Sequence, residues 1–243
     1  MKDSLGNAAQ TTYTPFVNPV LPTAQGASST GEQGMKQQGT VAFTAGVGKN
    51  SDGTTGTVDL DPATATLIDG SGNPVSSLTI PHEGTYKIET TQDGNVTVSF
   101  TPEVAFTGKA TGVTVQMKDK NGTPATAKYL PTVIPVAPSG NDVVSSDIQG
   151  QPQTGTPTFK GGNDEVGIDE NVPPMIVDKD GSLVESLVAA GEGAYRIDTN
   201  TGTVTFSPEP SFTGKAAGIT VQRTDIVGNK VTATYTPTVI PVT

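Results

Sequence analysis

The chain contains no cysteine and no tryptophan, and large side chains of other types are scarce. Of its 243 residues, hydrophobic types make up 33% and aromatic types 5%. The absence of cysteine excludes disulfides, thiolate zinc sites and thioester adhesive chemistry. It suits exported proteins of organisms that avoid disulfides. With so few aromatic residues, we expect lean cores built mainly from Val, Ile, Leu and Ala.

Positive charge is also scarce, since 14 basic residues face 24 acidic ones and the net charge is −10. Such a surface repels phosphate backbones and anionic lipids, which are bound by clustered Lys and Arg. No apolar run approaches the roughly 20 residues that cross a bilayer. No signal segment follows Met1, and we expect the chain to be part of a longer parent. We therefore predict neither a nucleic-acid partner nor a membrane partner.

Repetition is the main feature that the chain does have. The segment FTPEVAFTG at 100–108 returns as FSPEPSFTG at 206–214, an offset of 106 residues. The same offset carries YLPTVIPV at 129–136 onto YTPTVIPV at 235–242, and the chain opens with the related YTPFVNPV at 13–20. Tandem repetition serves length, display or multivalency more often than a single reaction.

The repeats define the predicted domain organisation. We predict that residues 1–20 are the terminal strand of a preceding repeat, that 21–137 form the first full repeat, and that 138–243 form the second. Each full repeat is large enough for a core of its own.

Alternating apolar and polar residues predict short β-strands within each repeat. Val96, Val98 and Phe100 share one face of such a strand, and Val204 and Phe206 repeat the pattern. Further strands are expected at 112–116 and 125–129 and at their copies, 218–222 and 231–235. With 29 glycines and 19 prolines the composition disfavours helices. About seven strands per repeat predict an all-β protein with two tandem antiparallel β-sandwich domains.

Turns and junctions carry their own signals. Asn121-Gly122 between two alternating runs predicts a hairpin, because both residues tolerate positive φ. Pro131, Pro135 and Pro138 leave the first full repeat, and Pro237 and Pro241 leave the second. Proline fixes φ and donates no hydrogen bond, so we expect these stretches to be extended and stiff. The two domains should then lie end to end as an elongated rod.

The second repeat contains the most specific pattern, EGAYRID at 192–198, TGTVTFSPEPSFTG at 201–214, GITVQRTD at 218–225 and TATYTPTV at 232–239. This pattern resembles the CshA-type fibril repeat, which occurs in tandem in cell-wall-anchored surface adhesins of streptococci and related Gram-positive bacteria. The resemblance covers nearly the whole chain. It implies an extracellular fibril in which the repeats form a stalk, while a separate region carries much of the host recognition. The first repeat departs from the pattern at 92–95 (QDGN) and at Leu130, where a Thr is usual.

Candidate catalytic residues have structural explanations in the sequence. His82 is the only histidine, and Gly191 stands opposite it in the second copy, which argues against a Ser-His-Asp arrangement. Three acidic positions occur in both copies, and Pro, Thr and Gly surround them, which is typical of turn caps. These pairs are Asp61 and Asp169, Glu103 and Glu209, and Asp119 and Asp225. The resemblance adds no catalytic motif, so we predict no catalytic residue and no enzyme activity.

Two kinds of bound or modified group stay open. The run DKDG at 178–181 has two carboxylates before a glycine, as calcium loops do, but the first copy offers only DGSG at 69–72 and neither has the downstream Glu of an EF-hand. Lys109 and Lys215 are retained in both repeats and are candidates for an intramolecular amide with Asn or Asp. Against this, Asn121 stands opposite Val227, and Asn73 stands opposite Ser182. We predict no metal ligands and no cofactor.

Two functions fit these observations. The first is a structural stalk that projects an adhesive tip from the bacterial surface towards a host or other bacteria, with neighbouring repeats as its contacts and the chain itself monomeric. The second is a low-affinity binding module, in which each repeat contacts a host matrix protein or glycan and avidity multiplies weak contacts. Interface anchors are usually Tyr, Trp or Arg. Tyr13, Tyr129 and Tyr235 are one repeated position, which we expect to be packed, so the composition favours the stalk.

Overall fold

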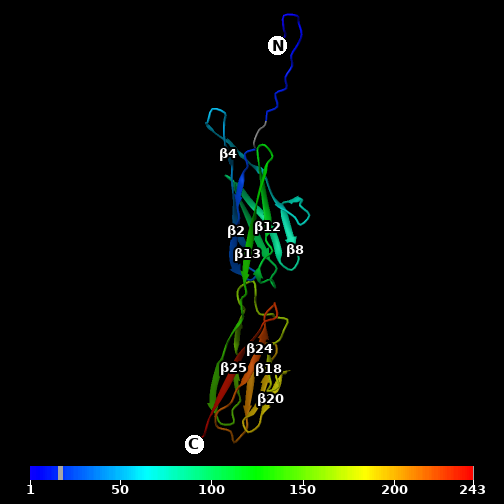
Figure 1. Ribbon diagram of the computed structural model, residues 1–243. Coiled ribbons are helices and arrows are strands. Elements are labelled where there is room, and N and C mark those ends of the chain that lie inside the picture. Colours follow the sequence, from blue (N-terminus) through cyan, green and yellow to red (C-terminus); the bar gives the residue numbers. More distant parts are fainter. Residues whose placement is uncertain (16–18, 243) are drawn as a thin grey trace.

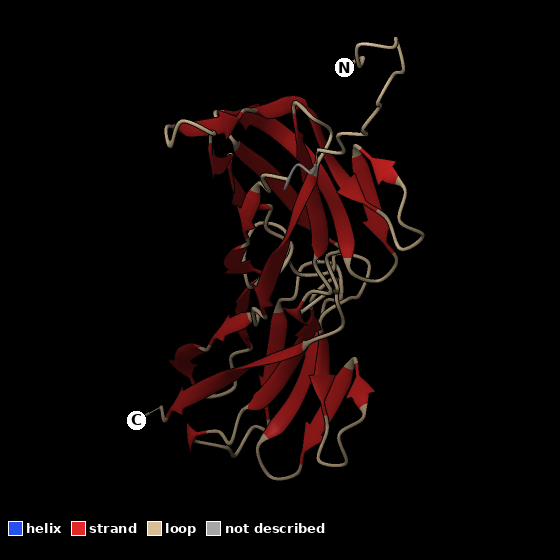
Figure 2. Cartoon of the chain, turned by 45° about the horizontal axis from the view of Figure 1, so that its top comes forward, coloured by secondary structure: helices blue, strands red, loops and turns tan. Residues whose placement is uncertain are grey.

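All regular elements in the described part of the chain are β-strands (Figure 1, Figure 2). The computed structural model describes residues 1–15 and 19–242. None of these residues belongs to a helix of the length and hydrophobicity that a bilayer crossing needs. The all-β prediction is confirmed.

The strands of the first repeat are β1 (Thr23–Gln25), β2 (Ala27–Glu32), β3 (Gln37–Thr44), β4 (Gly46–Lys49), β5 (Thr55–Val58), β6 (Leu60–Ile68), β7 (Pro74–Val75), β8 (Ser77–Ile80), β9 (Gly84–Gln92), β10 (Asn95–Pro102), β11 (Gly108–Lys109), β12 (Val113–Asp119) and β13 (Pro124–Ile134). Those of the second are β14 (Ser139–Asn141), β15 (Val143–Ile148), β16 (Gln153–Gly155), β17 (Thr158–Lys160), β18 (Met175–Val177), β19 (Leu183–Val184), β20 (Ser186–Ala189), β21 (Gly193–Ile197), β22 (Val204–Pro208), β23 (Gly214–Lys215), β24 (Ile219–Thr224) and β25 (Lys230–Ile240). About seven strands per repeat was too low a count, because each repeat also contains several strands of only two or three residues.

Each repeat is a sandwich of two sheets. In the first, the sheet β1-β3-β10-β9-β8 packs on the sheet β11-β13-β12-β6-β7. In the second, β16-β22-β21-β20 packs on β15-β25-β24-β18-β19. No strand pairing in the described residues joins one repeat to the other. Residues 46–58 form the β4–β5 hairpin, which Figure 1 shows at the end of the first repeat nearest the N-terminus.

The sequence suggested purely antiparallel sheets, but one sheet of each repeat also contains a parallel strand pair. In each repeat the first long strand pairs in parallel with the last one: β2 with β13, and β15 with β25. The chain enters the first repeat in one sheet as β1, crosses at Gly26, and continues in the other sheet as β2. Its first and last strands then run in the same direction, which consecutive hairpins alone would not produce. We call these two pairs the terminal strand pairs.

An aromatic cluster occupies the centre of each core. In the first repeat the ring of Tyr86 stacks on Phe100 at a centroid distance of 4.6 Å and meets Tyr129 edge-on at 6.2 Å. In the second, Tyr195, Phe206 and Tyr235 repeat the arrangement at 4.6 and 6.3 Å. Aliphatic residues, mainly Val with some Ile, Leu and Ala, surround these rings in greater number, as predicted. By volume, however, the tyrosines and phenylalanines are the largest fully buried side chains.

A glycine in each repeat makes room for the last strand's tyrosine. A Cβ atom on Gly39 would lie 2.2 Å from the Tyr129 ring, and one on Gly155 would lie 2.4 Å from the Tyr235 ring. No side chain fits at this distance, so the ring lies directly on the backbone of the facing strand. The expectation that Tyr129 and Tyr235 are packed is confirmed, while Tyr13 is 87% exposed.

Two prolines lie inside strands, not in the junctions where the sequence suggested. Pro131 is buried within β13, and Pro237 is buried within β25. Their carbonyl oxygens accept hydrogen bonds from Ala110 and Ala216, on the edge away from β2 and β15. The nitrogen and the carbonyl of one strand residue point to the same edge of the strand. Each proline nitrogen therefore also faces away from β2 or β15, and its missing N–H removes no hydrogen bond from the terminal strand pairs. The junction itself is residues 135–138.

The tightest hairpin turn also differs from the prediction. Asp93 and Gly94 both have positive φ, 48° and 80°, as in the two-residue turns that match the strand twist. They join β9 to β10. At the predicted Asn121-Gly122 turn only Gly122 has positive φ, and a longer loop connects β12 to β13.

Residues 1–15 and 19–22 form no named strand, and Lys2 and Ala8 make one isolated bridge. Their assignment to a preceding repeat, like the boundaries at 21–137 and 138–243, stays a prediction.

Separate cores predict separate losses of stability. Replacing Phe206 with Ala removes a ring that is fully buried among second-repeat residues, and the cavity should lower the free energy of unfolding of that repeat by about 3–5 kcal/mol. Phe100→Ala should do the same to the first repeat alone. Residue-resolved hydrogen exchange in urea measures both, and loss of protection throughout the chain after either change would contradict separate cores.

Candidate functional site

The buried carboxylates Asp119 and Asp225 hold turns together. The Oδ1 atom of Asp119 accepts hydrogen bonds from the backbone N–H groups of Asn121 and Thr123, at 2.9 and 2.8 Å. Asp225 Oδ1 accepts the same pair of bonds from Val227 and Asn229, at 3.1 and 2.7 Å. The second oxygen differs between the copies: Asp225 Oδ2 accepts the Asn229 side-chain amide at 2.9 Å, whereas Asp119 Oδ2 is buried with no hydrogen-bond partner among the described residues. The prediction of turn caps is confirmed for this pair.

Glu103 and Glu209 also bind backbone, and they do so beside the lone histidine and its counterpart. Glu103 Oε1 accepts the N–H of His82 at 3.0 Å, and Glu209 Oε1 accepts that of Gly191 at 3.1 Å. Both recipients have left-handed backbone, with φ of 63° at His82 and 82° at Gly191. The shared feature of the two copies is therefore a backbone conformation, which a glycine adopts more easily than a histidine.

The third acidic pair is used differently in the two copies. Asp61 makes a partly exposed ion pair with Lys120 at 3.3 Å. Asp169 Oδ1 accepts the backbone N–H of Asn171 at 2.9 Å and the side-chain amide of the same residue at 3.0 Å. Neither arrangement brings two carboxylates together, so no acid–base pair forms here.

The calcium candidates are turn caps as well. Asp178 Oδ1 accepts the N–H groups of Asp180 and Ser182, at 2.9 and 2.8 Å. Asp69 Oδ1 accepts those of Ser71 and Asn73, both at 2.8 Å, and these bonds hold the pKa of the Asp69 carboxyl below its usual value. In the described residues no group of three or more His, Cys, Asp or Glu side chains is arranged to hold a metal ion.

Lys109 and Lys215 both lie exposed, in the two-residue strands β11 and β23. An intramolecular amide of the proposed kind needs a lysine beside a buried carboxylic acid. No hydrogen bond or ion pair in the described part of the chain joins either lysine to Asn, Asp or Glu. The geometry gives this modification no support.

One buried acid was missed by the sequence reading. Glu83 is 5% exposed, and its two carboxylate oxygens accept hydrogen bonds from the Tyr86 hydroxyl and the Thr111 N–H, both at 2.7 Å. Burial raises the pKa of the Tyr86 phenol, and the neighbouring Glu83 raises it further. In the second copy Glu192 accepts the N–H of Ala217, and among the described residues no hydrogen-bond partner reaches the buried Tyr195 hydroxyl. The glutamate in the GxY context at 83–86 and 192–195 was the available signal.

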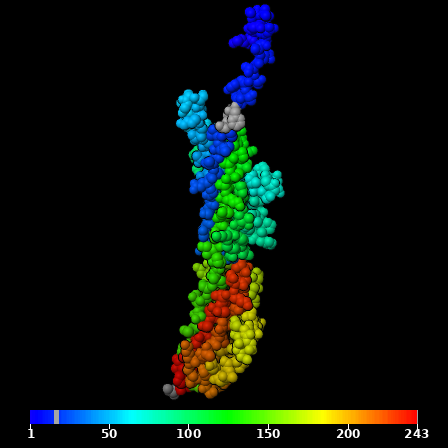
Figure 3. Space-filling view, in the orientation of Figure 1, coloured from blue at the N-terminus to red at the C-terminus, as the bar shows by residue number. Residues whose placement is uncertain are grey.

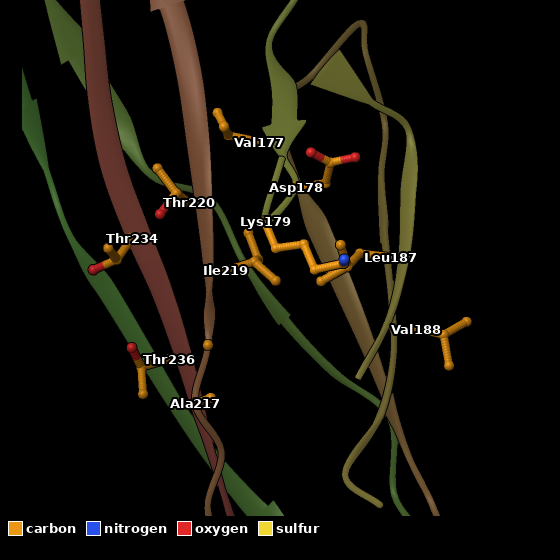
Figure 4. Close-up of a pocket in the computed structure, with 11 residues that line it drawn as sticks. Val177, Asp178, Lys179, Leu187, Val188, Ala217, Ile219, Thr220, Thr234 and Thr236 are labelled. Carbon is orange, nitrogen blue, oxygen red and sulfur yellow. The ribbon is translucent and has the colours of Figure 1, made fainter. Parts of the chain in front are cut away.

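A groove in the second repeat lies over β18, β20, β24 and β25. It has a volume of about 590 Å³ and is open to solvent. Figure 4 shows the Lys179 side chain extending across it between Ile219 and Leu187, while Val188 points outward. The lining combines apolar side chains with threonines, the Asp178 carboxylate and the Lys179 ammonium group. In the first repeat Leu130 replaces Thr236 at the corresponding place and covers Gly112.

A second set of contacts joins the two repeats. Gln33 is 4% exposed; its Nε2 donates to the Val104 carbonyl at 2.9 Å and its Oε1 accepts the Val136 N–H at 3.3 Å. From the second repeat, Asn163 Nδ2 donates to the Gln33 carbonyl at 3.0 Å and to Glu32 Oε2 at 3.3 Å. Figure 3 shows the two repeats in contact at this level. No local sequence pattern indicates that these residues are in contact.

The strained backbone at His82 yields a stability prediction. Because a left-handed conformation costs a non-glycine residue about 1–2 kcal/mol, His82→Gly should raise the free energy of unfolding of the first repeat by up to about 1 kcal/mol after the entropy of the unfolded glycine is counted. His82→Ala keeps the strain and should give no gain. Urea midpoints compare the two, and equal effects would show that the imidazole, not the backbone, matters.

The chain was compared with curated proteins and with solved structures. No curated protein matches the chain. Solved structures of low similarity include the titin I9–I11 tandem (12% identity, TM-score 0.32, covering 91% of this chain and 66% of that one), mouse cadherin-23 EC22–24 (14%, 0.34, 92% and 65%) and the Yersinia pseudotuberculosis adhesin InvE (16%, 0.28, 88% and 57%). The chain spans 57–66% of the length of each of these three structures, which is less than two thirds.

A family profile gives a definite assignment. The profile described as the surface adhesin CshA repetitive domain matches twice in tandem, over residues 19–133 and 135–239. Such repeats are a non-catalytic kind of domain and belong to extracellular cell-surface proteins. The tandem matches, the repeated sandwich and the repeated aromatic core agree, and the chain therefore belongs to the CshA repeat family of surface adhesins.

Proposed function

We propose that the chain is a stalk segment of a fibrillar adhesin, anchored in the cell wall of a Gram-positive bacterium, which projects an adhesive tip towards a host or other bacteria. One observation carries this proposal: the features that both copies share are the frame, namely the aromatic core, the turn caps and the terminal strand pairs. Repeating a frame without a repeated site adds length, which is what a stalk needs.

The junction supports an elongated, stiff arrangement. Pro135 and Pro138 restrict the backbone of the four-residue connection between β13 and β14. Asn163 adds hydrogen bonds from the second repeat to Glu32 and Gln33, where β2 ends and the turn to β3 begins in the first repeat. Together these contacts limit bending, so we propose a monomeric rod whose nearest partners are neighbouring repeats of the same chain.

A second candidate function is binding by the repeat itself, to a host matrix protein or glycan. The groove beside Lys179 and Leu187 is the observation that favours it. Against it, the groove offers no aromatic or arginine side chain, which are the usual anchors of an interface. The stalk therefore fits the molecule better.

Scattering tests the rod. Small-angle X-ray scattering of the two-repeat chain should give a monomer with the elongated profile of two domains in line, and a compact globular profile would contradict it. Asn163→Ala removes the hydrogen bonds to Glu32 and Gln33 and should increase bending at the junction. Asp164→Ala, at the exposed neighbouring position, should leave the profile unchanged.

Binding separates the two candidate functions. The two-repeat chain should give no saturable signal on a glycan array or on immobilised matrix proteins, because a stalk makes no such contact. Val188→Glu serves as the control, since Val188 lies at the groove and is 78% exposed. Saturable binding that Val188→Glu abolishes would replace the stalk with a binding module.

A further inference from the structure

We propose that the terminal strand pairs are load-bearing elements that resist unfolding when the chain is pulled from its ends. The inference rests on the proposed stalk role for its biological meaning, because only a segment under tension needs such an element. The observation behind the proposal is the parallel pairing of the first and last strands in each repeat, which would keep the repeat folded under tension.

In each repeat, tension would enter through one member of the pair and leave through the other. In the second repeat the chain enters through β14 and β15 and leaves through β25, and six register pairs run from Val143 opposite Tyr235 to Ile148 opposite Ile240. Because the strands are parallel, a pull on the start of β15 and on the end of β25 slides one along the other. The hydrogen bonds then lie across the pull and must break together. The first repeat has the same geometry over Ala27–Glu32 and Tyr129–Ile134.

The direction of the backbone amides in β15 follows from contacts at its ends. Gln149 donates its N–H to the Ile240 carbonyl at 2.8 Å, and the Asp142 side chain accepts the N–H of Thr234 at 2.7 Å. Since amides alternate along a strand, those of Ser145 and Asp147 point towards β25, and those of Val144 and Ser146 point away. Pro237 breaks none of these bonds, because its carbonyl faces Ala216 on the opposite edge of β25.

Side chains join the two strands a second time. The Ser145 hydroxyl lies 2.7 Å from the Tyr235 hydroxyl and donates to Gln153 Oε1 at 2.6 Å. Gln153 Nε2 in turn donates to the Thr238 carbonyl of β25 at 2.9 Å. Sliding β15 along β25 would break these bonds, and the Tyr235 ring would have to leave the position against Gly155 in the core.

The first repeat contains the same network in its own residues. Ser29 lies 2.7 Å from the Tyr129 hydroxyl and donates to Gln37 Oε1 at 2.6 Å, and Gln37 Nε2 reaches the Thr132 carbonyl at 3.1 Å. Gln37 and Gln153 are both buried, at 6% and 4% exposure. A buried polar network that recurs with the same partners at the same strand pair reinforces the link that tension would load.

Single-molecule pulling in two directions tests the proposal directly. The chain has no cysteine, so engineered cysteine pairs define the two points of attachment. Ser139→Cys with Val242→Cys loads the β15–β25 pair in shear, whereas Ser139→Cys with Lys230→Cys opens the same pair from one end. At equal pulling speed the first pair should unfold at a force about twofold higher or more, because forced unfolding depends on the barrier along the pulled direction. Equal forces would overturn the proposal.

A matched pair of proline variants tests the hydrogen bonds themselves. Asp147→Pro removes an amide that points towards β25, and Ser146→Pro removes one that points away; both side chains are exposed. When the whole chain is pulled from its ends, Asp147→Pro should lower one of the two unfolding forces, and Ser146→Pro should leave both unchanged. Equal effects of the two variants would overturn the proposal. Neither result depends on the binding and scattering experiments, so the stalk role and the load-bearing role can fail separately.

Discussion

The pairing of the first and last strands is the interaction on which the rest of each repeat depends. It closes the sandwich, because β2 and β15 cover the edge that β13 and β25 would otherwise expose. It also fixes the tyrosine of the last strand, whose ring lies on a glycine backbone and stacks edge-on against the second tyrosine of the core. Burial raises the pKa of the Tyr129 and Tyr235 phenols, so both stay neutral partners of their serines at ordinary pH.

Several acidic residues stabilise turns and loops by accepting hydrogen bonds from backbone N–H groups. Asp69, Asp119, Asp178 and Asp225 each close a turn by accepting backbone N–H groups, and Glu103 and Glu209 each bind the loop before β9 or β21. These hydrogen bonds stabilise turns and loops without burying apolar side chains, which suits a repeat with a small hydrophobic core. The excess of negative charge keeps the exterior soluble and repels other acidic surfaces.

The strongly periodic parts of the fold could be predicted from the sequence. The alternation at Val96, Val98 and Phe100 identified a strand and its buried face, and all three side chains are fully buried. The parallel terminal pair could not be predicted, because alternation gives the face of a strand and says nothing of its neighbour. Pro131 was wrongly assigned to the junction for a related reason. Proline excludes a hydrogen bond on only one edge of a strand, and the sequence does not show which edge is paired.

Among the candidate site residues, those whose contacts are local in sequence could be predicted, and those with distant contacts could not. Acidic residues within Pro-Gly-Thr contexts were identified as caps because the turn is local in sequence. The contacts of Gln33 with Val104, Val136 and Asn163 join residues 71 to 130 positions apart, so no local pattern reveals them. Glu83 was overlooked because its burial depends on β9 and on the loop before β12 together, and a lone glutamate before a glycine is an ordinary turn residue.

Amide hydrogen exchange in the intact chain tests the terminal strand pairs most directly. We predict slow exchange at Ser29, Gly31 and Gln33, and at Ser145, Asp147 and Gln149, whose amides face the last strand. We predict fast exchange at the residues between them, Ser28, Thr30, Val144 and Ser146, whose amides face away. Uniformly fast exchange along β2 and β15, or protection without this alternation, would contradict the account.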